Sequence, residues 1–132
     1  MGEKIISQIT EGISVQVETF YKPEHNEQIE DEHLFAYRIT INNLGSFPIK
    51  LHARHWEILD ASGTHRIVDG EGVVGEQPII NPGEQYQYVS AVNLESEMGS
   101  MQGYYTMINL FNNRSFNVII PEFTLVVPYV LN

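Results

Sequence analysis

The 132-residue sequence contains no cysteine. This absence excludes disulfide bonds, thiolate zinc sites and thiol nucleophiles, and it is typical of proteins from a reducing compartment. No stretch approaches the roughly 20 consecutive apolar residues of a membrane-spanning helix, and the N-terminus lacks the apolar core of a secretory signal. We therefore expect a cytoplasmic protein with no membrane partner.

Basic residues are scarce. Seven lysines and arginines face 17 aspartates and glutamates, which gives a formal net charge of −10. Such a surface repels phosphate backbones, so we expect no nucleic-acid partner, although acidity can also serve solubility alone. The length of 132 residues and the 42% hydrophobic content suit one globular domain over residues 1–132.

Helical periodicity is also missing. Apolar residues instead alternate with polar ones, which predicts strands with one buried face. The inward set comprises Ile13, Val15, Val17, Phe35, Tyr37, Ile39, Ile41, Tyr86, Tyr88, Phe116, Val118, Ile120, Phe123, Leu125 and Val127. Short turn sequences such as Asn81-Pro82-Gly83 separate the runs, so the pattern indicates an all-β sandwich or barrel.

One predicted strand changes phase. Ile49, Leu51 and Ala53 occupy odd positions, whereas Trp56 and Ile58 occupy even ones. A β-bulge near Arg54-His55 would place both sets on one face, and burial of both faces at the strand end is the alternative. Ahead of it, residues 22–32 carry five acidic side chains and one lysine, which predicts a solvated loop.

The run Gly70-Glu71-Gly72-Val73-Val74-Gly75 matches the dinucleotide-binding pattern G-x-G-x-x-G. That pattern needs a helix behind the glycines to hold a pyrophosphate. Pro78 and the Asn81-Pro82-Gly83 break exclude such a helix, so we expect no nucleotide cofactor.

Two loops remain candidate binding surfaces. The glycine run is expected to be a sharply turned connection, or alternatively a nest of N–H groups that binds a small anion with the help of Arg66 or His65. The second candidate is a predicted loop over residues 93–103, in which Met98, Gly99, Met101, Gln102 and Gly103 are available to a partner.

Several segments of the chain form a linked set of motifs. They are Arg54-His55-Trp56-Glu57-Ile58, the glycine run through Pro78, Pro82-Gly83-Glu84-Gln85-Tyr86-Gln87-Tyr88, Gly99 to Tyr105, and Ile120-Pro121-Glu122-Phe123. Together these segments resemble the ApaG (CorD) domain family. The resemblance spans about residues 10 to 130 in the family's order. It implies an immunoglobulin-like or fibronectin type III-like, two-sheet antiparallel β-sandwich. It also implies a link to cobalt and magnesium resistance and a kinship with adaptor domains.

Metal and catalytic sites find little support. His52 and His55 point to opposite faces of a regular strand, so they cannot share one ion unless the bulge reorients them. No serine lies in a nucleophile elbow, and neighbouring carboxylates fall in the solvated acidic segment. Trp56 is expected in the core, while Tyr104, Tyr105 and Phe111 are alternative recognition residues.

We therefore expect a non-catalytic binding module whose partner is another protein, with no cofactor and no metal ligand set. The alternative is a small-anion or divalent-metal-linked protein, with pyrophosphate-type binding at Gly70–Gly75 or a role in cobalt and magnesium homeostasis.

Overall fold

The computed structural model describes residues 5–22 and 32–128 of the chain. Within these ranges the structure contains nine strands, which are β1 (Ile5–Thr10), β2 (Ile13–Tyr21), β3 (His33–Asn43), β4 (Ile49–Asp60), β5 (His65–Glu71), β6 (Ile79–Ile80), β7 (Gln85–Leu94), β8 (Met98–Asn109) and β9 (Ser115–Val126). Of the predicted acidic loop over residues 22–32, residues 23–31 lie outside the described residues.

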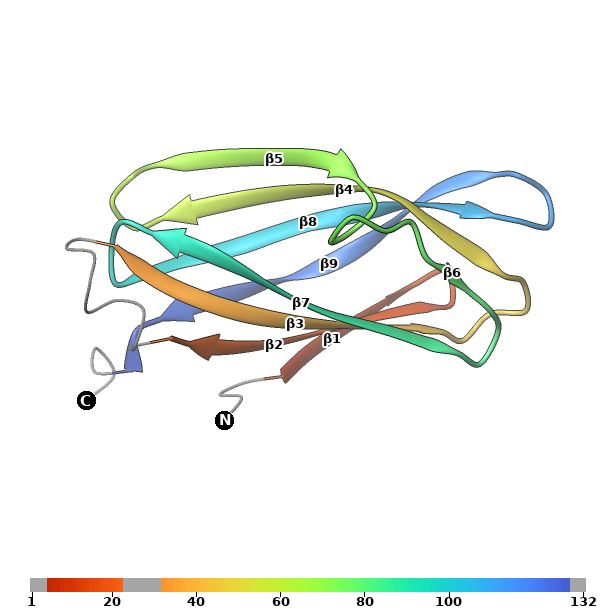
Figure 1. Ribbon diagram of the computed structural model, residues 1–132, viewed down its shortest axis with the longest axis horizontal. Coiled ribbons are helices and arrows are strands. Elements are labelled where there is room, and N and C mark those ends of the chain that lie inside the picture. The colour runs from red at the N-terminus through yellow and green to blue at the C-terminus, as the bar shows by residue number, and fades with distance from the viewer. Residues whose placement is uncertain (1–4, 23–31, 129–132) are drawn as a thin grey trace.

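The strands form two antiparallel sheets packed face to face (Figure 1). One sheet has the order β1-β2-β3-β7, and the other has the order β5-β4-β8-β9 with the short β6 added to β4. The predicted two-sheet antiparallel sandwich is therefore confirmed. No helix among the described residues is long and apolar enough to cross a membrane.

The core lies between the sheets and comes from the alternating residues. Val15, Ile39, Leu51 and Tyr105 are fully buried, and Trp56 is only 3% exposed. The prediction that Trp56 belongs to the core is confirmed, and Tyr105 joins it. Phe111, by contrast, is 72% exposed and stacks on Phe47 at a centroid distance of 4.5 Å.

The phase change in β4 has the expected cause at a different place. The register between β4 and β8 shifts between Leu51 and Ala53, rather than at Arg54-His55. Because the extra residue comes earlier, Arg54 has the inward phase of Trp56 and Ile58. A second shift lies opposite Gln102, where β9 carries the extra residue at Pro121-Glu122; a proline is tolerated there because a bulge frees it from the ladder.

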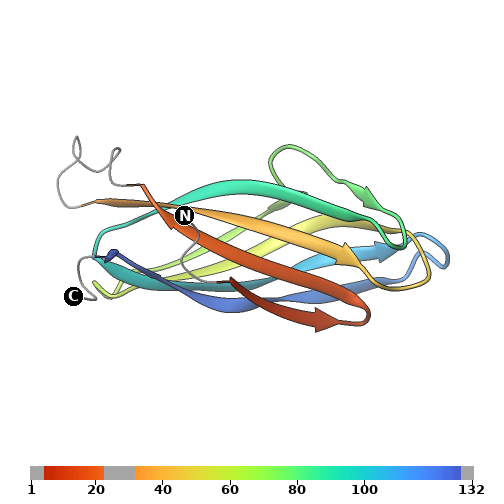
Figure 2. The same cartoon turned by 90° about the horizontal axis from the view of Figure 1, so that it is seen from below.

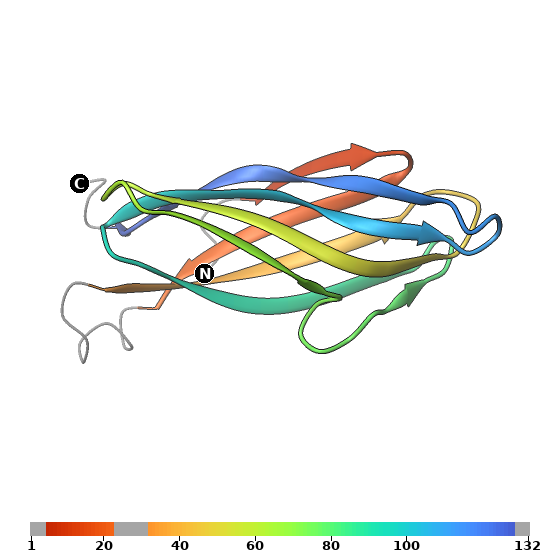
Figure 3. The same cartoon turned by 90° about the horizontal axis from the view of Figure 1, so that it is seen from above.

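The two long edges of the sandwich differ. At one edge β1 lies beside β9, as two views show (Figures 2 and 3), and the Ile119 N–H donates to Thr10 Oγ1 at 3.2 Å. At the other edge β7 and β5 end their sheets without pairing with each other. We call the first the closed edge and the second the open edge.

Candidate functional site

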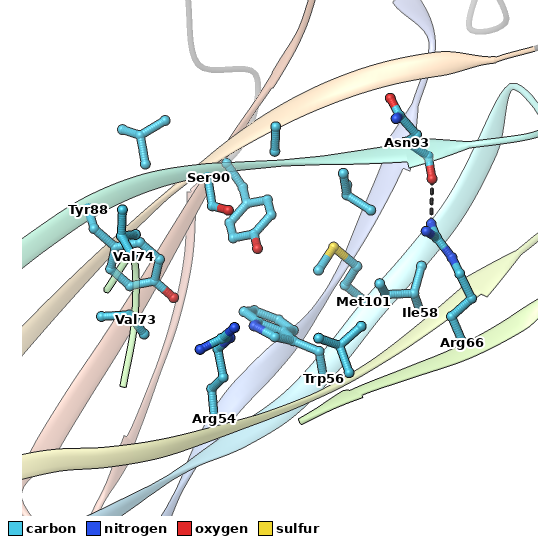
Figure 4. A pocket seen from close by; sticks show the side chains of 15 residues that line it. Arg54, Trp56, Ile58, Arg66, Val73, Val74, Tyr88, Ser90, Asn93 and Met101 are labelled. Carbon is cyan, nitrogen blue, oxygen red and sulfur yellow. Dashed lines mark hydrogen bonds between the residues drawn. The ribbon is translucent and has the colours of Figure 1, made fainter. Parts of the chain in front are cut away.

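A groove of about 460 Å³ runs along the open edge between β7 and β5 (Figure 4). Its walls come from three sources. One wall is β7 from Tyr88 to Asn93. The opposite wall is formed by Arg66 and Val68 of β5 together with the turn at Val73-Val74. The floor is the inner face of β4. We refer to this feature as the open-edge groove.

The floor of the groove is aromatic and rigid. Trp56 meets Tyr37 edge to face at 5.5 Å between ring centroids, and it meets Phe123 and Tyr105 in the same manner at 5.9 and 6.5 Å. Edge-to-face pairs of this kind add stability beyond area burial. The groove is therefore a surface on a packed core rather than a gap between loops.

The tyrosines Tyr37 and Tyr88 line the base of the groove. The hydroxyls of Tyr88 and Tyr105 lie 2.5 Å apart and share a hydrogen bond. Burial raises the pKa of Tyr88, Tyr105 and Tyr37 above the usual phenol value, although the positive charge of Arg54 opposes the shift in all three. These phenols therefore stay neutral at physiological pH, as hydrogen-bond donors rather than bases.

Arg54 reaches under β5 to the glycine run. Its Nη1 donates to the carbonyl oxygens of Glu71 and Gly72, each at 2.9 Å. Gly70 makes room for this side chain, because a Cβ at that position would lie 2.7 Å from the guanidinium. The first glycine of the run thus serves to position an arginine.

The rest of the glycine run is a tight turn, as predicted. Val73 and Glu76 exchange both backbone hydrogen bonds, and the two residues between them, Val74 and Gly75, have φ of 48° and 78°. This is a two-residue turn of type I′, which requires positive φ at both central residues. Gly72 also has φ of 56°, and a Cβ there would lie 1.9 Å from the Glu76 carbonyl oxygen.

The alternative prediction, an anion-binding nest in this run, stays a prediction. A nest needs successive N–H groups that converge on a ligand. The N–H groups of Gly72, Val73 and Glu76 already donate to the carbonyls of His52, Glu76 and Val73. These bonds close the turn and fasten it to β4, so three N–H groups of the run are already used within the fold.

Arg66 belongs to the groove rather than to the turn. It lies on β5 opposite Ile58, and its Nη2 donates to the carbonyl oxygen of Asn93 across the groove (Figure 4). His65, its predicted helper, instead lies near Glu57, with 3.7 Å between His65 Nε2 and Glu57 Oε1.

The prediction of a loop over residues 93–103 is wrong. β7 continues to Leu94 and β8 begins at Met98, so only a short turn separates them. Met101 is 1% exposed in the core. Gly99 and Gly103 permit close approach to β4, because added Cβ atoms would lie 2.5 Å from the Leu59 carbonyl oxygen and 1.9 Å from that of His55. The small residues that suggested a loop reflect strand packing, and Gln102 lies opposite the β9 bulge.

The histidines of β4 make ordinary polar contacts. His55 stacks on Tyr104 at 4.8 Å between ring centroids, and its Nδ1 lies 2.6 Å from Asp69 Oδ1. The bond to Asp69 raises the pKa of His55, and a weaker one to Glu57 adds to the effect. In the described part of the chain, no group of three or more histidine, aspartate or glutamate side chains is arranged to hold a metal ion.

Sequence reasoning missed the central residue of the groove. The sequence marks Arg54 as part of a family-like segment and of the expected bulge but not as a binding residue, and its inward phase depends on where the bulge in β4 lies. An arginine sharing the phase of Trp56 and Ile58 was the available signal. Tyr88 was placed in the core, correctly, but its hydroxyl at the groove base required the two sheets to be seen together.

Chemically, the groove offers cations, neutral phenols and apolar surface. The hydrogen bonds made by its residues include no serine or threonine paired with a histidine, the arrangement that activates a hydroxyl nucleophile. Such a groove can bind, and it favours a ligand that has both apolar and anionic parts.

Comparison with known proteins gives a consistent family. Residues 23–109 match the sequence profile of the ApaG domain. The chain is 46% identical over 120 residues to Protein ApaG of Nitrosomonas eutropha, covering 91% of this chain and 94% of that protein. It is 42% identical over 120 residues to Protein ApaG of Pectobacterium carotovorum, covering 91% and 95%.

Solved structures agree in fold. An X-ray structure of a Northeast Structural Genomics Consortium target superposes with a TM-score of 0.84 at 42% identity, covering 95% of this chain and 94% of the other. A crystal structure described as an ApaA protein of Bordetella pertussis superposes with a TM-score of 0.83 at 38% identity, covering 88% and 94%.

Proposed function

This chain belongs to the ApaG domain family, and on that premise we propose that it is a non-catalytic binding module that holds an extended segment of a partner protein in the open-edge groove. The proposal keeps the expected class of function but moves the contact surface. The groove includes Val73 and Val74 of the glycine run, and it takes the place of the predicted loop over residues 93–103 as the second part of the contact surface.

The observation that carries the proposal is the unpaired edge of β7 above an aromatic floor. The Asn43 N–H donates to the Glu84 carbonyl, and alternate residues of β7 follow the same pattern toward β3. The N–H and C=O groups of the odd-numbered residues therefore point away from β3, as the bond from Arg66 to the Asn93 carbonyl illustrates. An extended peptide can pair with such an edge by strand addition.

Backbone strain at the rim of the groove supports the same surface. Val74 has φ of 48° although it is β-branched, and its side chain is 63% exposed at the groove wall. A left-handed conformation costs a non-glycine residue about 1–2 kcal/mol. Exposed apolar residues kept in strained conformations are characteristic of contact sites.

The second candidate is binding of a small anion, which Arg54 and Arg66 favour because both lie in the groove. A role in cobalt or magnesium homeostasis stays a prediction, without a cluster of ligands among the described residues to support it. A cytoplasmic location, and the absence of nucleic-acid and membrane partners, stay expectations from the cysteine-free, acidic composition.

The test removes one outward-pointing N–H. Ala91 is exposed and lies opposite Ala36 of β3. Its N–H points away from β3, as at the other odd-numbered positions of β7. Ala91→Pro deletes that donor while leaving the β3–β7 ladder intact, because proline is tolerated on the free side of an edge strand. Ala91→Ser keeps the donor and is the matched control.

Immobilised wild-type protein and both variants are incubated with a native lysate, and retained proteins are quantified by mass spectrometry. We expect a set of proteins retained by the wild type and by Ala91→Ser and lost from Ala91→Pro, with all three proteins showing the same β-sheet circular dichroism. The same proteins retained on all three would refute strand addition at β7.

A further inference from the structure

The four arginines of the chain fall into two kinds. Arg38 and Arg114 lie outside the groove and are neutralised by glutamates, with 2.8 Å from Arg38 Nη2 to Glu18 Oε1 and 2.6 Å from Arg114 Nη2 to Glu11 Oε1. Arg54 and Arg66 both line the open-edge groove, and their hydrogen bonds go only to backbone carbonyls. In a chain of net charge −10, the two arginines that have no carboxylate partner among the described residues thus line the same groove.

Resting on the proposed function, we propose that the open-edge groove recognises a partner strand with two acidic side chains four residues apart, one bound by Arg54 and the other by Arg66. The residue midway between them is apolar. The occupant is an acidic extended protein segment, and the shared chemistry is a carboxylate, or an equivalent anion, at each end of the groove.

The spacing follows from strand geometry. Arg66 is opposite Ile58, and Arg54, Trp56 and Ile58 lie at alternate positions along the inner face of β4. The two arginines are thus four strand residues apart, which is about 13 Å at roughly 3.3 Å per residue. On a bound strand, side chains at positions i and i+4 point to the same face and match this separation.

The apolar requirement comes from the middle of the groove. Between the two arginines the lining is Trp56 on the floor and Val68 on the side. The side chain at position i+2 of the bound strand faces these groups. Burial of an apolar side chain there is favourable by about 25 cal/mol per Å² removed from water, whereas an unpaired polar group would lose hydration.

Arg54 is prepared for a carboxylate. Only its Nη1 is engaged, by the Glu71 and Gly72 carbonyls, and these bonds fix the plane of the guanidinium. Among the described residues, its remaining N–H groups donate to no carboxylate, and the neighbouring phenols of Tyr37 and Tyr88 are neutral. A fixed guanidinium loses little entropy when it binds a planar anion.

The overall negative charge does not prevent this recognition. Charges separated by more than about 8 Å are largely screened at physiological ionic strength. None of the described residues that line the groove is acidic. Close to it in the chain, Glu76 accepts a hydrogen bond from Tyr86 at 2.7 Å, and Asp69 contacts His55. The local field at the groove is therefore set by the two arginines.

The experiment selects peptides without assuming a partner. A displayed library of random ten-residue peptides is panned against wild type, Arg54→Gln, Arg66→Gln and the matched control Arg114→Gln. We expect the wild type and Arg114→Gln to enrich sequences with acidic residues at i and i+4 and an apolar residue at i+2. Each groove variant should lose the acidic preference at one of the two positions.

A double-mutant cycle then measures one contact. The most enriched peptide is synthesised with glutamate or glutamine at the position assigned to Arg66. The Kd of each peptide is then measured for the wild type and for Arg66→Gln. We expect glutamine to weaken binding to the wild type about tenfold and to have little effect on Arg66→Gln, as for a partly desolvated charge pair. Because Arg66 contributes only one hydrogen bond to the fold, this cycle stays informative even if Arg54→Gln loosens the glycine turn.

The outcomes separate the two proposals. Enriched peptides that bind wild type but not Ala91→Pro, yet show no acidic pair, would overturn this inference and leave strand addition standing. If no peptide is enriched, or if binding is insensitive to Ala91→Pro, strand addition itself fails. If pyrophosphate or inorganic phosphate binds with the same dependence on Arg54 and Arg66 while peptides do not, the occupant is a small anion and the peptide inference is overturned.

Discussion

The two long edges of this sandwich are built differently. At the closed edge, β1 and β9 lie together, the Thr10 hydroxyl joins the sheets, and the pocket lined by Ile6 and Phe123 measures about 110 Å³. At the open edge, β7 and β5 leave a groove of about 460 Å³ that holds two arginines. One edge of the sandwich is thus covered, as is usual for edge strands, whereas the other can pair with another chain.

Specific side-chain contacts nevertheless hold the open edge in place. β5 is exposed along nearly its whole length, so apolar burial does little to hold it. Side chains from β4 secure it instead: Arg54 bonds to the Glu71 and Gly72 carbonyls on the inner side, and His55 contacts Asp69 on the outer side. A groove kept open by specific polar bonds is unlike a packing defect, which would collapse.

The largest expected effect tests whether the groove floor is core. Trp56→Ala removes a side chain that contacts Tyr37, Tyr105 and Phe123, so we expect the free energy of unfolding to fall by about 3–5 kcal/mol. Urea denaturation followed by tyrosine fluorescence measures it. A loss below about 1 kcal/mol would mean that the floor is loosely packed, and the distinction between a built groove and a gap would fail.

The next effect separates two glycines of one turn. Gly72→Ala combines a φ of 56° with a Cβ 1.9 Å from the Glu76 carbonyl oxygen, whereas Gly75→Ala has a φ of 78° and open space around the new Cβ. We expect losses of about 2–3 kcal/mol and about 1 kcal/mol respectively, from overpacking plus strain and from strain alone. Thermal unfolding compares them. Equal losses would show that position 72 is not packed against the Glu76 carbonyl group.

These two glycines also show what the sequence could and could not reveal. The missing helix behind Gly75 was predictable from Pro78, and so was a turn with positive φ. The alternating core residues placed most strands correctly. The edge strands β1 and β5 were not foreseen, because each is mostly exposed and shows no apolar–polar alternation. β8 was not foreseen either, since its first residues were predicted to belong to a loop.

The groove was harder to foresee than the fold. Its two arginines are 12 positions apart in the sequence, and the β4–β5 hairpin brings them to the same groove. The wall opposite β5 comes from β7. Single-residue phase errors also matter: placing the bulge at Arg54-His55 instead of between Leu51 and Ala53 leaves the direction of Arg54 undecided. Local patterns thus predict strands, whereas a site made by three strands depends on register.

A third prediction concerns the rim of the open edge and has the opposite sign. Val74→Asn replaces a β-branched residue at φ of 48° by one that type I′ turns favour, and the lost side chain is 63% exposed. We expect a gain in stability of about 1 kcal/mol, seen as a higher Tm, together with weaker retention of partners. A more stable variant with unchanged retention would remove Val74 from the contact surface.

The closed edge provides the corresponding test. Thr10→Val keeps the shape of the side chain but removes the oxygen that accepts the Ile119 N–H. We expect a loss of about 0.5–1.5 kcal/mol, as for one hydrogen bond, and no change in partner retention. Reduced retention would show that both edges take part in binding, and the functional contrast between them would be lost.

The smallest effect is a dependence of stability on pH at the outer side of the open edge. The bond to Asp69 raises the pKa of His55 in the folded state above its usual value of 6.5. The protonated histidine is therefore favoured by folding, and its contribution to stability is complete below about pH 6.5 and is lost as the pH rises through the folded-state pKa.

Asp69→Asn removes the partner of His55, so the unfolding free energy of this variant should decline less than that of the wild type across this pH range. Denaturant midpoints between pH 6 and pH 9 provide the measurement, with Thr10→Val, which leaves the His55–Asp69 contact in place, as the control expected to keep the wild-type slope. Identical slopes for wild type and Asp69→Asn would mean that this contact does not help to hold β5 on β4, and Arg54 would then be the β4 side chain that holds β5 in place.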